Sequence, residues 1–175
     1  ELVPTDEYTK CIYIPIGVGV AVPPWNFPLS LIGGMVAAAV VTGNSIVCKP
    51  SSDSPIVAYK FVELCEKAGI PAGVVNYIPG SGSDIGDFIV EHPLTRFINF
   101  TGSKEIRFRI NEHAAKISKG QKWIKRVVAE MGGKNAIIVD SSANIKKAAQ
   151  GIASSAFTFQ GQKCSACSRA IVMSD

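Results

Sequence analysis

Short runs rich in Val and Ile alternate along the chain with longer segments in which apolar residues recur every three or four positions. The short runs are typical of buried strands, and the longer segments have the period of amphipathic helices. The pattern predicts strands at residues 16–22, 45–49, 74–78 and 96–100, helices at residues 29–42, 55–68 and 84–91, and a further helix opened by Thr101-Gly102-Ser103. This alternation is typical of successive βα units, so we expect an α/β fold with a doubly wound, Rossmann-like parallel sheet.

The pattern changes after residue 126. Two apolar runs, RVVAE (126–130) and AIIVD (136–140), flank Met131-Gly132-Gly133-Lys134, a break too tight and too rich in glycine to form a helix. A helix is then predicted from about residue 144 to residue 159, and it leads into GQKCSACSR at 161–169. We therefore place a boundary between two structural units near Gly132.

The composition favours a folded domain and argues against several partners. Of the 175 residues, 47% are hydrophobic and 18% are charged, so the chain can bury a core. The most apolar run, 29–41, is too short to span a bilayer. The net charge is +4, and the one dense basic stretch, 116–126, contains a single Trp, which favours a solvated face over a nucleic-acid site. We expect neither a membrane nor a nucleic-acid partner.

The cysteines and the start of the sequence suggest a compartment. Five cysteines without a framework spacing, and no signal peptide at the start, favour a reducing, cytoplasmic setting. The opening ELVPTDEYTK has no initiator Met, so we expect the sequence to be a piece of a longer chain.

Two glycine-containing turns follow predicted strands. Gly80-Ser-Gly82-Ser-Asp-Ile-Gly86 opens a predicted helix, so its backbone amides could face a phosphate, although the third glycine comes one residue late for GxGxxG. Thr101-Gly102-Ser103 is a similar site. A structural turn that needs positive φ and a simple helix cap are the alternatives.

Three side chains at the ends of predicted strands carry candidate chemistry. Lys49 follows the second strand, where doubly wound sheets bind ligands, and its ammonium can donate to ribose hydroxyls or neutralise a phosphate. Asn26 lies in the proline-rich turn PPWNFP, and a rigid turn suits an amide that stabilises developing charge. Glu130 precedes two glycines and could act as a base toward water. A surface lysine, a structural turn and a solvent-facing carboxylate are the alternatives.

The motif Cys164-Ser-Ala-Cys167 admits three interpretations. A zinc site needs four ligands, and the two histidines, His92 and His113, are not spaced as a ligand pair, so no metal is expected. A thioredoxin-like pair would open a helix within its own βαβ unit, whereas this motif follows a long α/β region. A single nucleophilic thiol is favoured, and the spacing does not choose between the two cysteines.

Six motifs taken together resemble the aldehyde dehydrogenase superfamily; they occur in the order PPWNFP, KPSS, PGSG, FTGS, EMGGK and GQKCSACSR. The resemblance runs from about residue 15 to residue 172. It implies a dinucleotide-binding domain at residues 1–131 and the beginning of a catalytic α/β domain at residues 132–175. Within the superfamily, GQKWIKRVVAEMGGKNAIIVD is similar to members that oxidise glutamate γ-semialdehyde, which forms from 1-pyrroline-5-carboxylate, to glutamate in proline degradation.

The resemblance implies three catalytic residues. The family nucleophile lies three residues after the Gly of GQ, which is Cys164 here, and Cys167 falls at a position that the family leaves variable. The general base is the Glu before the GG pair, Glu130. The side-chain amide of Asn26, together with the backbone amide of Cys164, holds the oxyanion of the tetrahedral intermediate.

The resemblance also implies a nicotinamide cofactor. It places Lys49 near the adenosine ribose and Gly80 near the adenine end, and the full set of implied cofactor-binding residues is Trp25, Lys49, Ser52, Gly80, Ser103 and Gly132. Many NAD-preferring members carry a Glu at the position of Ser52, and Ser removes the charge that would repel a 2′-phosphate. We therefore expect NAD, with NADP as the alternative.

The substrate residues implied are Ser165, similar to the hydroxyl that anchors the glutamate carboxylate, and Phe27, which resembles an aromatic that packs on the aliphatic part. Lys163 is either a further partner for the carboxylate or a surface charge. The alternatives are an aldehyde dehydrogenase of other specificity, a noncatalytic nucleotide-binding module, and a CxxC oxidoreductase that would require Cys167. The resemblance further implies that the parent chain forms a homo-oligomer and that this piece alone has little turnover.

Overall fold

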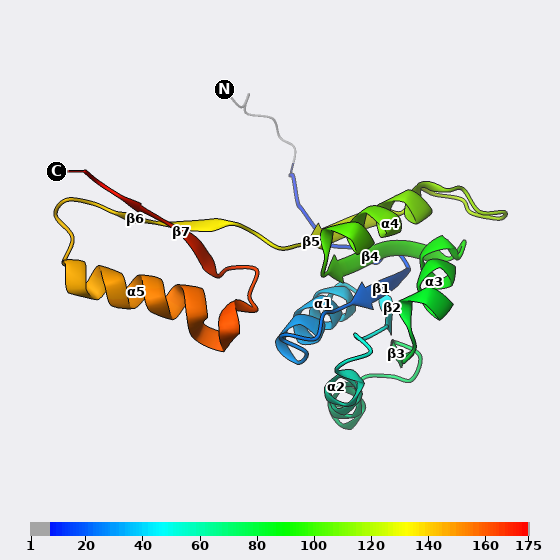
Figure 1. Cartoon of the computed structure of the whole chain (residues 1–175). Helices are drawn as coiled ribbons and strands as arrows, with labels where there is room; N and C mark the ends of the chain where they lie inside the picture. Colours follow the sequence, from blue (N-terminus) through cyan, green and yellow to red (C-terminus); the bar gives the residue numbers. More distant parts are fainter. Residues whose placement is uncertain (1–7, 175) are drawn as a thin grey trace.

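The computed structural model describes residues 8–174. Its larger part is a five-stranded sheet in the order β3-β2-β1-β4-β5 (Figure 1). The strands are β1 (Val18–Val22), β2 (Ser45–Cys48), β3 (Val75–Tyr77), β4 (Thr95–Thr101) and β5 (Arg126–Glu130), and every neighbouring pair is parallel. The chain winds outward from β1 to β3 and then returns to the other side of β1, which is the order of a doubly wound sheet. The predicted fold class is confirmed.

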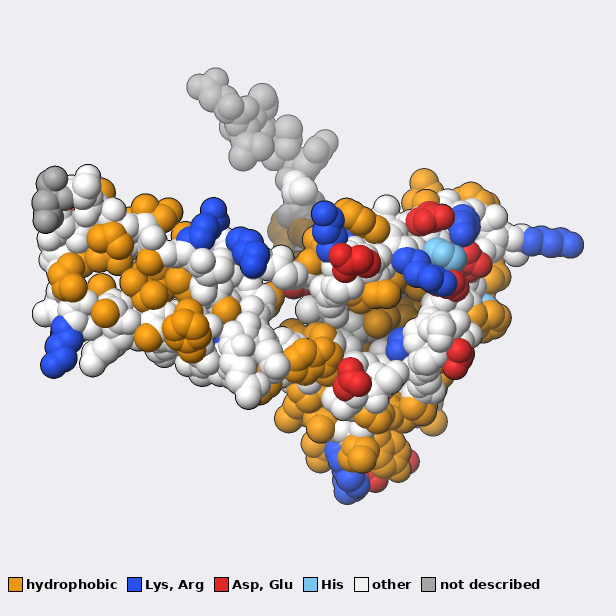
Figure 2. Space-filling view, in the orientation of Figure 1, with side chains coloured by type: hydrophobic (Ala, Val, Ile, Leu, Met, Phe, Trp, Pro, Cys, Tyr) orange, Lys and Arg blue, Asp and Glu red, His pale blue; other side chains and the backbone are white. Residues whose placement is uncertain are grey.

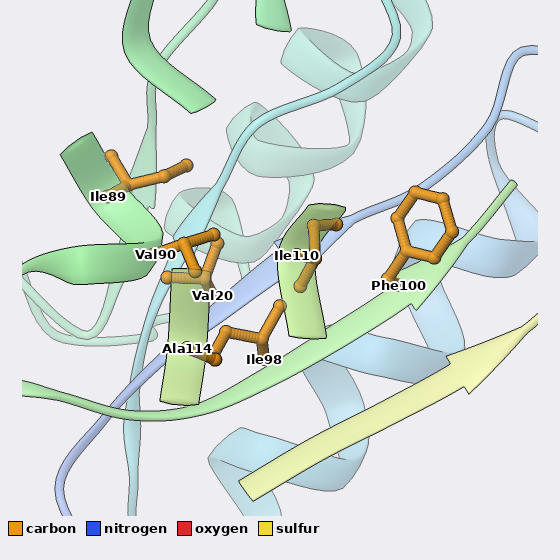
Figure 3. Packing of buried hydrophobic residues seen from close by; sticks show 7 residues of the cluster. All are labelled: Val20, Ile89, Val90, Ile98, Phe100, Ile110 and Ala114. Atoms are coloured by element: carbon orange, nitrogen blue, oxygen red, sulfur yellow. The ribbon is translucent and has the colours of Figure 1, made fainter. Parts of the chain in front are cut away.

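Helices cover both faces of this sheet. The helices are α1 (Ser30–Val41), α2 (Pro55–Lys67), α3 (Asp87–Glu91) and α4 (Lys104–Ala115). Because side chains alternate along a strand, Val20 packs toward α3 and α4, whereas its neighbour Ala21 packs toward α1 and α2. Figure 3 shows the first of these two clusters, in which Ile98 and Phe100 of β4 meet Ile110 of α4.

The second part is a smaller unit at the end of the chain. It consists of β6 (Asn135–Val139), α5 (Ile145–Phe157), a 3-10 turn η2 (Thr158–Gly161) and β7 (Cys167–Val172), with β6 and β7 parallel. Residues 131–134 connect it to β5 (Figure 1). No residue of α5 is buried, and hydrophobic side chains lie open on this unit (Figure 2).

Four local features differ from the sequence prediction. β7 was not predicted, and the predicted helix at 84–91 begins instead with a π-helical turn, η1 (Gly82–Gly86). The helix predicted to reach residue 159 ends at Phe157, because Phe159 and Gln160 adopt positive φ. The basic stretch 116–126 is not a purely solvated face, since Lys125 is 94% buried and burial lowers its pKa.

Among residues 8–174 no helix combines the length and the hydropathy needed to cross a membrane. The same residues contain no cluster of His, Cys, Asp and Glu that could hold a metal ion.

Candidate active site

The carboxyl ends of the sheet strands lie along one edge. The register pairs Ala21 with Cys48, Cys48 with Tyr77 and Thr101 with Glu130, so the ends of these strands are level. Parallel strands all deliver their following loops to the same edge. The loops that carry PPWNFP, KPSS, PGSG, FTGS and EMGGK therefore emerge together.

The loop that carries Cys164 is held against the link between the two units. The side-chain amide of Asn135 donates to the backbone carbonyl of Cys164 at 2.7 Å and to that of Ala166 at 3.3 Å. A Cβ added at Gly133 would lie 3.0 Å from the Cys164 carbonyl oxygen. A side chain at this position would crowd the carbonyl, so the second glycine of EMGGK favours the close approach of the two backbones.

The first loop of the sheet also reaches the cysteine loop. Asn26 Nδ2 donates to the backbone carbonyl of Gln162 at 2.9 Å, across 136 residues of sequence. The rings of Phe27 and Phe159 lie 5.6 Å apart at a tilt of 39°. A primary amide has two N–H donors. One of them therefore ties the two units together, and the other has no partner among residues 8–174.

The two cysteines of the motif differ in their surroundings. Cys164 is exposed, whereas Cys167 is 93% buried at the start of β7 and its thiol donates to the backbone carbonyl of Arg169 at 3.2 Å. Both are free thiols. An exposed thiol in an open loop is accessible to a substrate, while a buried, hydrogen-bonded thiol is typical of a structural residue.

Glu130 is the last residue of β5, and its side chain is exposed. Its backbone carbonyl accepts a hydrogen bond from Gly102 N at 3.1 Å, which fixes the end of the strand beside the FTGS turn. Gly133, which packs against Cys164, lies only three residues further on. Three residues span at most about 11 Å, so the Cα atoms of Glu130 and Gly133 are no further apart than this.

The turn before the cysteine loop is strained. Phe159 and Gln160 have φ of 56° and 58°, a left-handed conformation that non-glycine residues adopt rarely. Phe159 is held there partly by its contact with Phe27. Consecutive residues of this kind cost free energy and are concentrated at functional sites, where surrounding contacts maintain them.

A second group of candidate residues meets at the far end of the same edge. The Lys49 side chain donates to the backbone carbonyls of Pro50 at 3.0 Å and Gly80 at 3.1 Å, and the Ser52 hydroxyl donates to Gly80 at 3.5 Å. Lys49 is 94% buried, and burial lowers its pKa. An ammonium carries three N–H donors. Two of them are used here, so one remains for a ligand.

Lys49 also lines a cavity of about 390 Å³. Most of the cavity wall is apolar and comes from α3 and α4, with Ile89 and Val90 on one side and Ile106 and Ile110 on the other. Gly82 of the PGSG turn and the next residue, Ser83, also line the cavity. A mainly apolar cavity beside a buried ammonium suits an aromatic ring joined to a hydroxyl-rich group, which fits the adenosine half of a dinucleotide.

The remaining predicted residues have fewer contacts. Ser103 caps α4 by accepting from Ile106 N at 3.3 Å, and Trp25 is 44% exposed on the first loop. Gly132, Lys163 and Ser165 lie next to the residues that join the two units, and within residues 8–174 their side chains form no hydrogen bond with the other candidate residues.

Sequence reasoning did not identify Asn135, Gln162 or Phe159 as parts of the site. Asn135 lies between the EMGGK motif and the apolar run AIIVD. Its place next to EMGGK is the only feature of the sequence that could have suggested a role in the site. Phe159 was assigned to a helix, so its positive φ and its contact with Phe27 could not be anticipated.

The chain is thus an α/β protein in which the loop of an exposed cysteine contacts the turn after the first strand of a doubly wound sheet. Residues 1–175 match the sequence model of the aldehyde dehydrogenase family, and the chain belongs to this family. The predicted family is confirmed.

The relatives that the chain matches share a more specific name. A 1-pyrroline-5-carboxylate dehydrogenase of Geobacillus thermodenitrificans is 60% identical over 169 residues, which are 97% of this chain and 33% of the relative. The crystal structure of a Thermus 1-pyrroline-5-carboxylate dehydrogenase with bound NAD is 49% identical, with a TM-score of 0.87 over 91% of this chain and 31% of that one. The structure of a point mutant of the Thermus thermophilus enzyme is 48% identical, with a TM-score of 0.90 over 99% of this chain and 34% of that one. The chain thus spans about a third of the length of these relatives.

Proposed function

We propose that this chain carries the cofactor-binding sheet and the nucleophile of an NAD(P)-dependent enzyme that oxidises glutamate γ-semialdehyde to glutamate in proline degradation. The observation that carries the proposal is the bond from Asn26 Nδ2 to the Gln162 carbonyl, which brings the rigid turn after β1 against the loop of Cys164. The similarity to 1-pyrroline-5-carboxylate dehydrogenases supports this choice of substrate.

The reaction begins at the thiol. The Cys164 thiolate attacks the aldehyde carbon, a C–S bond forms, and the carbonyl oxygen becomes an oxyanion. The free N–H of Asn26 Nδ2 and the backbone N–H of Cys164 donate to that oxygen. Donors that are fixed before the reaction stabilise developing charge without further reorganisation, and the bond from Asn26 to Gln162 provides this rigidity.

The cofactor fits the second group of residues. Lys49 supplies the remaining N–H of its buried ammonium to ribose hydroxyls, and the cavity between α3 and α4 accepts the adenine ring. Ser52 is exposed and uncharged at this point, so it does not repel a 2′-phosphate. When bound, a nicotinamide cofactor supplies the acceptor for the hydride that leaves the substrate carbon. We propose NAD as this cofactor, with NADP as the alternative.

The second half of the reaction uses the carboxylate. Once the carbon is oxidised, the substrate is a thioester of Cys164. Glu130 takes a proton from water, the resulting hydroxide attacks the thioester carbon, and the C–S bond breaks to return the Cys164 thiolate. Exposure of Glu130 at the end of β5 gives water access to the carboxylate.

The substrate carboxylate requires its own partners. Ser165 and Lys163 flank Cys164, so a hydroxyl and an ammonium can meet an acidic group while the thiol meets the aldehyde. Phe27 and Phe159 form an apolar wall. The methylene groups that separate the aldehyde of the substrate from its carboxylate can pack on this wall. A substrate that carries an aldehyde and a carboxylate on a short chain matches this arrangement.

The test is NADH or NADPH formation by the full-length protein that contains this chain, with glutamate γ-semialdehyde, succinic semialdehyde and betaine aldehyde. The proposal predicts the highest kcat/KM for glutamate γ-semialdehyde and loss of activity in Cys164→Ser. Cys167→Ser and Cys11→Ser are the matched controls, one buried in the motif and one exposed elsewhere, and both should remain active. Nucleotide binding without turnover of any aldehyde would refute the proposal, and full activity in Cys164→Ser would refute the mechanism.

A further inference from the structure

The cavity beside Lys49 lies between two helices whose packing is uneven. Its inner wall is made by Val90 of α3 and Ile110 of α4, which are 3% and 7% exposed. Its outer margin is made by Asp87 and Arg109, whose side chains are 34% and 55% exposed. Apolar packing therefore fixes only the inner side of the cavity, and charged residues stand at its mouth.

Charged and polar pairs connect α3 and α4 across this mouth. Arg109 Nε donates to Asp87 Oδ1 at 2.9 Å while Arg109 Nη2 donates to Asp87 Oδ2, which makes the pair bidentate. One helical turn further along both helices, His113 Nδ1 lies 2.7 Å from Glu91 Oε1 and 3.7 Å from Asp87 Oδ1. Lys116 Nζ is 3.5 Å from Glu91 Oε1. We call these five residues the cross-helix ladder.

The spacing of the ladder follows from the helical repeat. Asp87 and Glu91 are four residues apart on α3, and Arg109 and His113 are four residues apart on α4, so each pair lies on one face of its helix. The two faces oppose one another, and acidic, basic and histidine side chains gather over these helices in Figure 2. The bond to Arg109 also lowers the pKa of Asp87, so this carboxylate is ionised at neutral pH.

The short length of α3 makes these contacts necessary. The helix has five residues and follows a π-helical turn, and so short a helix has little stability of its own in water. Its position is therefore set by what it contacts. Ile89 and Val90 anchor it to the sheet, and the ladder ties its outer face to α4. The Ser118 hydroxyl, which follows α4, also donates to the backbone carbonyl of Glu91 at 2.6 Å.

We propose that the cross-helix ladder fixes the width of the cavity between α3 and α4 and thereby sets the affinity for the adenine nucleotide half of the cofactor. The proposal rests on the proposed function, because it takes this cavity as the adenine site. Asp87 and Arg109 are positioning residues in this account: they act on the cavity wall and touch no reacting atom. Neutralising them should weaken nucleotide binding and leave the chemical step unchanged.

The first experiment measures binding of ADP-ribose, which lacks the nicotinamide ring, to the full-length protein by titration calorimetry. Arg109→Met should raise its Kd about two- to fivefold, the range expected for one exposed ion pair. The matched control is Lys60→Met, which removes another exposed pair, Lys60–Glu63 at 2.7 Å on α2, far from the cavity lining. It should leave the Kd unchanged.

The second experiment separates a positioning role from a loss of folding. The double variant Asp87→Arg with Arg109→Asp restores an ion pair of reversed direction, and it should recover most of the lost affinity. In steady-state kinetics Arg109→Met should raise the KM for NAD by the same factor, while kcat and the KM for the aldehyde stay as in the unaltered enzyme.

Each remaining outcome has a meaning. Unchanged ADP-ribose affinity in Arg109→Met, equal weakening in Lys60→Met, or no recovery in the double variant would overturn the ladder proposal. Failure of the unaltered protein to bind ADP-ribose would overturn it too. If the unaltered protein binds ADP-ribose and the variants behave as expected, but no aldehyde is oxidised, the proposed function fails and the ladder stands.

Discussion

The five-stranded sheet and the β6–α5–β7 unit differ in how far their side chains are buried. The sheet has helices on both faces, and Ile46 and Ile98 at its centre are fully buried. In the smaller unit Ile138 is 73% exposed and Phe157 is 76% exposed, and α5 contributes no buried residue. The sheet thus has a core of its own, while the unit that carries the nucleophile is held to it by a few specific contacts. The sheet therefore provides most of the stability. The nucleophile is positioned by the contacts between the two regions, which we call the joint: those of Asn26 and Phe27 with residues 159–162, and those of Gly133 and Asn135 with Cys164.

The largest expected effect is on the sheet core. Ile98→Ala removes a side chain with no exposed surface, and such truncations cost about 2–5 kcal/mol because they leave a cavity. Ile138→Ala in the smaller unit is the matched control, and it should change the free energy of unfolding by less than about 0.5 kcal/mol. Urea unfolding of the 175-residue chain measures both. Equal losses of unfolding free energy in the two variants would contradict the idea that the sheet core is the main source of stability.

A second prediction concerns the joint itself. Asn26→Ala in the full-length protein removes both the bond to Gln162 and the donor proposed for the oxyanion. Turnover should fall about 10²- to 10³-fold, the usual scale for one such donor. Asn111→Ala, an exposed amide on α4, is the control and should keep its activity. A fall of only a few fold in Asn26→Ala would limit this residue to a structural role.

The sheet and its helices could be predicted from the sequence, because strands that are buried on both faces consist mainly of apolar residues such as Val and Ile. The joint could not. Asn135 and Gln162 are polar residues with no periodic signal, and their contacts join parts of the chain that are far apart in sequence. The Asn135–Cys164 bond spans 29 residues, and the Asn26–Gln162 bond spans 136. β7 was missed since its residues are almost all exposed, apart from Cys167, and show no alternation of apolar and polar positions. Residue chemistry made Asn26 and Glu130 candidates but left alternatives open, and only the family resemblance chose Cys164 over Cys167. All three assignments stay predictions.

Loss of the Asn135 side chain should lower turnover less than loss of the Asn26 side chain. Asn135→Ala removes the bonds to the carbonyls of Cys164 and Ala166, and two such bonds are worth about 1–3 kcal/mol together. We expect about a tenfold loss of turnover and faster amide hydrogen exchange in residues 162–168 of the full-length protein. Unchanged exchange in this loop would mean that Gly133 and Asn26 suffice to hold it.

The smallest effect is a pH dependence that belongs to the sheet alone. Burial raises the pKa of the Cys48 thiol to about 12, with the charge of nearby Cys65 adding to the rise, whereas the thiol of an unfolded chain has a pKa near 9.0. The unfolded chain therefore loses this proton first, so stability is unaffected below pH 9 and falls as the pH rises from 9 toward 12.

Between pH 9 and 10 this thiol should account for a loss of about 1 kcal/mol. The measurement is urea unfolding of the 175-residue chain at a series of pH values. Cys48→Ala should show a smaller loss over this interval, and Cys11→Ala, which changes an exposed thiol, should not. Identical slopes in all three proteins would contradict the assignment.

The central claim is that the loop from the smaller unit presents Cys164 as the nucleophile to a substrate held at the carboxyl edge of the sheet. The most direct test traps the thioester. Full-length protein with Glu130→Gln, which should slow hydrolysis, is mixed with glutamate γ-semialdehyde and NAD, quenched in acid and analysed by peptide mass spectrometry. The claim predicts an acyl adduct on the peptide of residues 164–169, located at Cys164. An adduct located at Cys167, or turnover of the aldehyde by the Cys164→Ser variant, would contradict it.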